Sequence, residues 1–215
     1  MGKYDFIKIK KKLSKYLDEA RFEHTMGVMY TCAALAMVYG YDLEDAQAAG
    51  LLHDSAKCIP NKKKLKLCSQ HDIPVSDFEK DHPFLLHAKL GAYVASSKYD
   101  IKDEEILTAI TYHTTGRPGM SLLEKIVYIS DYIEPMRDKA PNLPKVRKIA
   151  FEDLDECMYE ILKDTLEYLE YLEAVRQKAC RIQRELEAVQ RSLRNTAERA
   201  ERAEREAQQA INTQA

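Results

Sequence analysis

Apolar residues recur along this chain three and four positions apart, and no stretch of useful length alternates in the two-residue period of a strand. The spacing predicts a helix over residues 19–39 that stops at Gly40, a residue suited to a left-handed helix end. A second helix is expected to begin after the capping residue Asp42 and to run to the pair His53 and Asp54. Further helices are predicted near residues 6–17, 61–70, 85–94, 103–112 and 121–134. The expected fold class is therefore all-α.

The pattern changes near Tyr171, within a long helical stretch that follows the loop of Pro141 and Pro144. Apolar and small residues from Val175 to Ala210 alternate at spacings of four and three, a heptad seam of about five repeats. The sequence thus predicts a domain over residues 1–170 and a C-terminal helix of coiled-coil character over 171–215. That helix could form a homo-oligomer or dock on another helix. It could also lie alone, because alanine at the seam buries little area. The basic residues switch from lysine to arginine after Lys178, which also suits an appended or engineered segment.

Composition narrows the class of protein. The net charge of −2 gives no electrostatic reason to expect a nucleic acid as partner. Five cysteines, an odd number without C-x-x-C spacing, indicate reduced thiols in a cytoplasmic protein. The first residues lack the apolar core of a signal peptide, and no apolar run approaches the ~20 residues that span a bilayer. We therefore expect a cytoplasmic protein without a membrane segment.

The pair His53 and Asp54 is the strongest chemical signal. Adjacent helix side chains diverge by roughly 100°, yet both can reach one metal ion placed between them. His24 and Asp131 lie on other predicted helices that could bring them to the same place. Such nitrogen and oxygen donors suit a divalent ion such as Mn, Fe, Co or Zn. For an isolated pair, a core histidine beside a helix-end aspartate is the simpler interpretation.

His87 and His113 also lie at helix ends beside small or turn-forming residues. If they reach the same pocket, six ligands are too many for one ion that leaves room for water, and they fit two ions bridged by Asp54. Two metals roughly 3.5–4 Å apart can clamp a phosphoryl group and generate hydroxide near neutral pH. Taken singly, each histidine is better explained by a hydrogen-bonded core or surface role. His71 and His82 lie in polar surroundings and are expected at the surface.

Five of the six candidate ligands lie in four ordered blocks of sequence. The blocks are Leu52-His-Asp-Ser-Ala-Lys57, Leu86-His-Ala-Lys-Leu-Gly-Ala92, Ala109-Ile-Thr-Tyr-His-Thr-Thr-Gly-Arg117 and Leu123-Glu-Lys-Ile-Val-Tyr-Ile-Ser-Asp-Tyr-Ile-Glu-Pro135. Together with His24, these blocks resemble the HD-domain metal-dependent phosphohydrolases, and among them the YqeK-type symmetrical bis(5'-nucleosyl)-tetraphosphatases. The resemblance covers about residues 4 to 170 and leaves the heptad helix without a counterpart. Ser130 is a minor departure, since a small residue such as alanine is usual there.

The resemblance implies a role for each matching residue. The first metal would be held by His24, His53, Asp54 and Asp131, and the second by Asp54, His87 and His113, with iron as the family's metal and Mn, Co or Zn as alternatives. Lys57, three residues after Asp54, is the candidate for neutralising phosphate charge as the bond breaks, or else an exposed helix-end lysine.

One of these blocks, and a residue just after the last block, could bind substrate phosphates. Thr114, Thr115 and Gly116 form a turn whose hydroxyls and amides could cradle a phosphate. Arg117 and Arg137 could bind phosphate in a bidentate way, although a plain surface role explains either equally well.

The activity implied is hydrolysis of diadenosine tetraphosphate to two ADP, with hydroxide from a binuclear metal centre attacking phosphorus. Asp131 could also accept a proton, although a ligand role comes first. One alternative is another HD-type hydrolase acting on a nucleotide, guanosine tetraphosphate or a cyclic dinucleotide, although the Gly-Tyr-Pro signature of the last branch is absent. The other is a non-catalytic coiled-coil assembly protein.

Overall fold

The computed structural model describes residues 2–140 and 142–213, and these residues contain helices and no strand. The expected all-α fold class is confirmed. The helices are α1 (Phe6–Leu13), α2 (Glu19–Tyr39), α3 (Leu43–Leu52), α4 (Asn61–Gln70), α5 (Asp77–Asp81), the 3₁₀ helix η1 (Pro83–Leu86), α6 (His87–Tyr99), α7 (Glu104–Tyr112), α8 (Leu122–Ile133), α9 (Leu143–Ile149) and α10 (Leu154–Thr213).

Local capping chemistry explains why the main helices begin and end as predicted. The Asp42 side chain accepts a hydrogen bond from the Asp45 amide at the start of α3. Ser121 and Glu124 form a reciprocal capping box at the start of α8. Gly40 ends α2 with φ of 69°, a left-handed conformation that glycine adopts without a steric cost. These helix ends are therefore determined by their own short sequences.

Three short helices were not predicted from the sequence. They are α5, η1 and α9, and α9 lies where the sequence suggested a loop around Pro144. Pro144 occupies the first turn of α9, where its missing amide hydrogen has no intrahelical partner to lose. The proline therefore begins a helix here instead of interrupting one.

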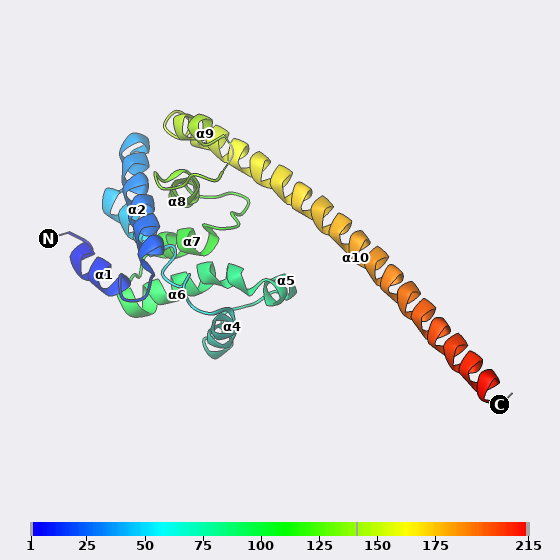
Figure 1. The fold of residues 1–215 in the computed structure, drawn as a ribbon. Helices are drawn as coiled ribbons and strands as arrows, with labels where there is room; N and C mark the ends of the chain where they lie inside the picture. Colours follow the sequence, from blue (N-terminus) through cyan, green and yellow to red (C-terminus); the bar gives the residue numbers. More distant parts are fainter. Residues whose placement is uncertain (1, 141, 214–215) are drawn as a thin grey trace. The chain divides into compact units, whose positions relative to one another are not determined.

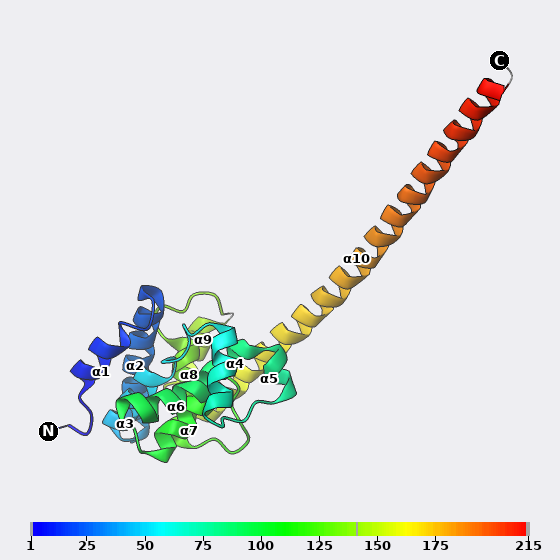
Figure 2. The ribbon, with the colours of Figure 1, turned by 90° about the horizontal axis from the view of Figure 1, so that it is seen from below.

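The helices of the N-terminal region form a bundle around one large apolar core, with a smaller core between α4 and α6 (Figure 1). Two glycines permit the close approaches that position the helix ends. A Cβ atom on Gly50 would lie 2.7 Å from the Cys32 sulfur, so α3 packs tightly on α2. A Cβ atom on Gly91 would lie 3.0 Å from the His53 carbonyl oxygen, so α6 passes close to the end of α3. The second contact brings the end of α3 close to the first turns of α6, within the bundle that Figure 2 shows from below.

The chain divides into two compact units after Leu162, within α10. In unit 1 the start of α10 belongs to the core through Leu154, Met158 and Ile161. In unit 2 the seam residues Ile182 and Leu186 are 55% and 50% exposed. No helix among the described residues is long and apolar enough to cross a membrane.

Candidate metal centre

Six side chains from five parts of unit 1 converge to form what we call the ligand cluster. His24 lies within α2, His53 and Asp54 follow the end of α3, and Asp131 lies in the last turn of α8. His87 is the first residue of α6, and His113 directly follows α7. The four histidines and Asp54 are buried, and Asp131 is partly buried. His71 and His82 lie outside the cluster, and the ring of His71 stacks on Tyr93.

Asp54 lies at the centre of the ligand cluster, and its two oxygens face different histidines. Oδ2 lies 3.5 Å from His53 Nε2 and 3.9 Å from His24 Nε2. Oδ1 lies 3.2 Å from His87 Nε2 and 3.6 Å from His113 Nε2. One carboxylate thus joins two pairs of imidazoles.

Asp131 completes the first of these two groups. Its Oδ1 atom lies 3.1 Å from His24 Nε2 and 4.0 Å from His53 Nε2. Burial by itself would raise the pKa of both carboxyls, yet the surrounding imidazoles hold the pKa of Asp54 and of Asp131 well below the usual range. Both side chains are therefore carboxylates that can bind a cation at neutral pH.

The hydrogen bonds of the imidazoles determine which ring nitrogen is free. Nδ1 lies 2.7 Å from a backbone carbonyl three residues earlier in His53, His87 and His113. A carbonyl oxygen can only accept, so Nδ1 carries the hydrogen and the Nε2 lone pair faces the cluster. His24 follows the same rule with a different acceptor, since its Nδ1 lies 3.0 Å from Glu134 Oε1.

These free lone pairs fit a cation. The Nε2 atoms of His87 and His113 lie 3.2 Å apart, where two lone pairs repel each other unless a cation or a proton lies between them. Three buried atoms of the cluster have no hydrogen-bond partner among the described residues: His24 Nε2, His53 Nε2 and Asp54 Oδ1. Burial lowers the pKa of His87, which keeps its Nε2 free of a proton.

The donor atoms also fall into two sets of metal-binding size. His24, His53 and Asp131 form one set and His53, Asp54 and His113 form another, and within each set the donor atoms lie within 4.8 Å of one another. Mixed nitrogen and oxygen donors of this kind suit first-row divalent ions.

Comparison with known proteins identifies the family. The HD domain model matches residues 21–136, a span that contains all six residues of the ligand cluster. This chain belongs to the HD domain family. Its relatives include "Bis(5'-nucleosyl)-tetraphosphatase, symmetrical" of Bacillus subtilis, 40% identical over 157 residues that cover 73% of this chain and 83% of that protein. The protein of the same name from Halalkalibacterium halodurans is 42% identical over 154 residues, which cover 72% of this chain and 81% of that protein.

A solved structure agrees with this assignment. A crystal structure described as that of a "predicted HD superfamily hydrolase involved in NAD metabolism", from Clostridium acetobutylicum, superposes with a TM-score of 0.74 at 40% identity. The superposition covers 78% of this chain and 88% of the Clostridium acetobutylicum chain. The chain is therefore a hydrolase of the HD domain family, and the family implies that it binds a divalent metal.

Basic side chains lie beside the ligand cluster. The Lys57 ammonium lies 3.7 Å from Asp54 Oδ1 and 3.1 Å from His87 Nε2. The Arg137 guanidinium lies 2.9 Å from Asp131 Oδ1. The sequence analysis missed Arg21, whose guanidinium lies 2.8 Å from Asp54 Oδ2. The available signal was its position three residues before His24, on the same face of α2.

The turn after α7 brings only part of the predicted phosphate-binding turn to the ligand cluster. The Thr114 hydroxyl lies 3.2 Å from His87 Nε2 and 3.0 Å from His113 Nε2. Thr115 is exposed, and Gly116 turns the chain with φ of 64°. Arg117 donates from both Nε and Nη2 to the buried Glu124 carboxylate, so its fork is already engaged.

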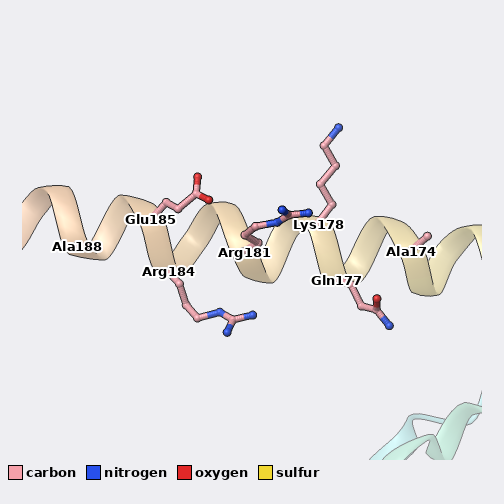
Figure 3. Close-up of a pocket in the computed structure, with 7 residues that line it drawn as sticks. All are labelled: Ala174, Gln177, Lys178, Arg181, Arg184, Glu185 and Ala188. Atoms are coloured by element: carbon pink, nitrogen blue, oxygen red, sulfur yellow. The ribbon is translucent and has the colours of Figure 1, made fainter.

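Elsewhere in the HD-domain chain, a shallow hollow runs along α10. Its lining comes from this single helix and includes Gln177, Lys178 and Arg184 (Figure 3). The side chains leave the helix in different directions and form no second wall (Figure 3). It therefore offers no buried ligands comparable with those of the metal centre.

Proposed function

We propose that this protein hydrolyses dinucleoside tetraphosphates symmetrically, converting diadenosine tetraphosphate to two ADP. Relatives from three bacteria, at 36–42% identity, carry the name of this activity. The observation that supports it most directly is the placement of Asp54, whose two oxygens face separate pairs of histidines. This arrangement suits two divalent ions, one held by His24, His53, Asp54 and Asp131 and the other by Asp54, His87 and His113.

Bound at these ligands, divalent ions would acidify a water molecule and polarise phosphoryl oxygens. The chain's own residues then have three tasks. Lys57 places a positive charge beside the Asp54 and His87 donors, where charge on a departing phosphate group develops. The Thr114 hydroxyl lies at the same edge and can hydrogen-bond a phosphate oxygen. Asp131 is a ligand first, and its carboxylate could also accept a proton.

The arginines divide into two groups under this proposal. Arg21 and Arg137 contact the two carboxylates of the ligand cluster, so they can orient those carboxylates and present positive charge to a polyphosphate. Arg117 would have to release Glu124 before it could bind phosphate, so a bidentate role there needs a rearrangement of that ion pair. Thr115 and Gly116 would act through their exposed turn.

Product analysis tests the assignment. The full chain, loaded with metal and incubated with diadenosine tetraphosphate, should release only ADP, which chromatography resolves from ATP and AMP. Release of ATP with AMP would overturn the symmetrical assignment. No cleavage by metal-loaded protein, with turnover of guanosine tetraphosphate, a nucleoside monophosphate or a cyclic dinucleotide, would favour another HD-type hydrolase.

For the metal, we infer that the resident ions are iron, with Mn, Co and Zn as chemically adequate replacements for this donor set. Elemental analysis of protein purified without added metal should find iron near two equivalents. His53→Ala should lose most of that metal. A stoichiometric content of another metal in the purified protein would contradict the choice of iron.

For the C-terminal unit, we propose that the heptad seam associates with a second copy of this chain. Leu172, Val175 and Ile182 are exposed along one side of α10, and Leu186 continues the same register. An isolated helix with such a seam gains stability when a partner helix covers it. Light scattering should show a homo-oligomer, and Ile182→Glu with Leu186→Glu should give the monomer mass.

A further inference from the structure

His24 differs from the other three histidines in how its ring is held. For His53, His87 and His113 the Nδ1 acceptor is a carbonyl three residues earlier, supplied by the same turn of chain. His24 lies inside the 21-residue helix α2, where the preceding carbonyls already accept the hydrogen bonds of the helix. Its acceptor is instead Glu134, 110 residues later, just after the end of α8.

The Glu134 carboxylate is held rigidly for this task. It is 2% exposed, and its Oε1 atom accepts from His24 Nδ1 at 3.0 Å. Its Oε2 atom accepts from the Met136 backbone amide at 2.7 Å. Arg147 donates to the backbone carbonyls of Ile133 and Glu134 at 2.9 and 2.8 Å. Both carboxylate oxygens and the backbone behind them are therefore fixed.

Gly27 supplies the space that this carboxylate occupies. A Cβ atom at residue 27 would lie 2.5 Å from Glu134 Oε2 and 3.4 Å from its Cδ atom. Glycine inside a helix costs about 1 kcal/mol relative to alanine, so its presence in the middle of α2 needs a reason. The close approach of Glu134 provides that reason, one turn after His24 on the same helix face.

We propose that Glu134 is a positioning residue for the metal centre and that Gly27, which has no side chain, leaves the space that the Glu134 carboxylate occupies. The carboxylate fixes the His24 tautomer, orients the ring, and makes Nε2 a stronger donor toward a divalent ion held with His53 and Asp131. The inference rests on the metal-binding role given to the ligand cluster under the proposed function. It adds a carboxylate that touches neither the ions nor the substrate.

The test is titration of metal-free, full-length protein with Co²⁺ alone, followed by calorimetry and visible absorption. The native chain should bind two equivalents. Glu134→Ala should weaken one equivalent by about 10- to 100-fold, the range found when outer carboxylates of metal-bound histidines are removed, and leave the other equivalent unchanged. Glu134→Gln should be intermediate, because its amide oxygen still accepts from His24 while its NH₂ group opposes the Met136 amide.

Gly27→Ala is an independent variant that keeps the Glu134 side chain but places a methyl group where its carboxylate lies. It should weaken the same equivalent of Co²⁺ and change the same absorption band. Combined with Glu134→Ala it should add little further loss, because both changes act on one contact. If Glu134→Ala does not fold, Glu134→Gln and Gly27→Ala test the same point.

Asp45→Asn is the matched control. It alters another buried carboxylate, which bonds Tyr4 and Lys3 away from the ligand cluster, and it should leave both Co²⁺ equivalents unchanged. Native Co²⁺ binding by folded Gly27→Ala and Glu134→Gln would overturn the positioning role. If the native chain binds two Co²⁺ but does not cleave diadenosine tetraphosphate, the proposed function fails, while a selective loss in these variants still supports the positioning role.

Discussion

The two units of this chain use similar apolar periodicity to different ends. In unit 1, Ile126 and Val127 of α8 are fully buried against neighbouring helices. In unit 2, Ile182 and Leu186 follow an equally regular period and remain half exposed. A period of apolar residues therefore defines the face of a helix and leaves open what covers that face. The helices of unit 1 bury one another's apolar faces around the candidate metal centre, whereas the seam residues of unit 2 remain half exposed.

The largest expected effect is on activity, when a carboxylate of the ligand cluster is removed and the result is compared with removal of a carboxylate in unit 2. Asp54→Ala removes the ligand that faces both pairs of histidines. Changes to residues that merely contact a metal ligand cost up to ~10²-fold in activity, so loss of this ligand itself should lower the rate of hydrolysis of diadenosine tetraphosphate by at least that factor. Glu173→Ala, which removes an exposed partner of Arg176, should leave the rate unchanged. ADP release at saturating metal measures both, and more than about a hundredth of native activity in Asp54→Ala would contradict the shared-ligand interpretation.

Leucine truncation should distinguish the two apolar faces in stability. Leu123→Ala creates a cavity in the main core and should lower the free energy of unfolding of unit 1 by about 2–5 kcal/mol. Leu186→Ala, at a half-exposed position, should change the same free energy by no more than about 0.5 kcal/mol. Urea unfolding followed by tyrosine fluorescence measures both variants. Equal losses would show that the seam supports unit 1.

Metal removal should destabilise the chain by a similar amount. An ion present at about 100 times its dissociation constant stabilises the folded state by about 2.7 kcal/mol. The loss of each ion to a chelator should therefore lower the melting temperature of unit 1 by roughly 5–11 °C. Calorimetry measures the shift, and Asp54→Ala serves as the control, because it should no longer respond to added metal.

Acidification should weaken the two halves of the ligand cluster at different pH values. Burial lowers the pKa of His24, but Asp131 and Glu134 outweigh it and the pKa is raised, so a proton competes with metal there from a higher pH. Burial lowers the pKa of His87, so its Nε2 stays free to a lower pH. As pH falls, the affinity at the His24 half should decline first, by up to about tenfold per pH unit. Co²⁺ titration at several pH values measures the order, and simultaneous loss would contradict it.

The smallest expected effect concerns activity after loss of the seam. A chain that ends at Leu172 retains all of unit 1, so its rate per site should stay within about 0.5 kcal/mol of the native rate, roughly twofold. Its mass by light scattering should be that of the monomer. A severalfold loss of activity in this monomer would show that association supports the metal centre.

The helix ends could be predicted because their signals are local. Gly40, Asp42 and Ser121 each determine a boundary through hydrogen bonds or a backbone angle within a few residues. Pro144 misled the sequence analysis because the same residue can interrupt a helix or begin one. Only the packing around a short segment distinguishes the two outcomes.

The residue types of the ligand cluster could be named from the sequence, and the family resemblance implied how they group, whereas the contacts that bring them together could not be predicted. The two faces of Asp54 depend on how closely α6 passes His53 at Gly91, a contact between segments far apart in the chain. Glu134 and Arg21 escaped notice for the same reason, since each acts through a residue on another element. Arg117 showed the reverse case, because a suitable side chain was already engaged by Glu124.

The hydrogen bonds of the four imidazoles also have a consequence for the order of assembly. Three of the rings can adopt their final orientation as soon as one short turn of chain has formed, because donor and acceptor are three residues apart. His24 receives its acceptor only when α8 has docked against α2. The orientation of its ring therefore reports the docking of α8 on α2, and a chain in which that docking has not occurred would hold three oriented imidazoles and a fourth that still rotates.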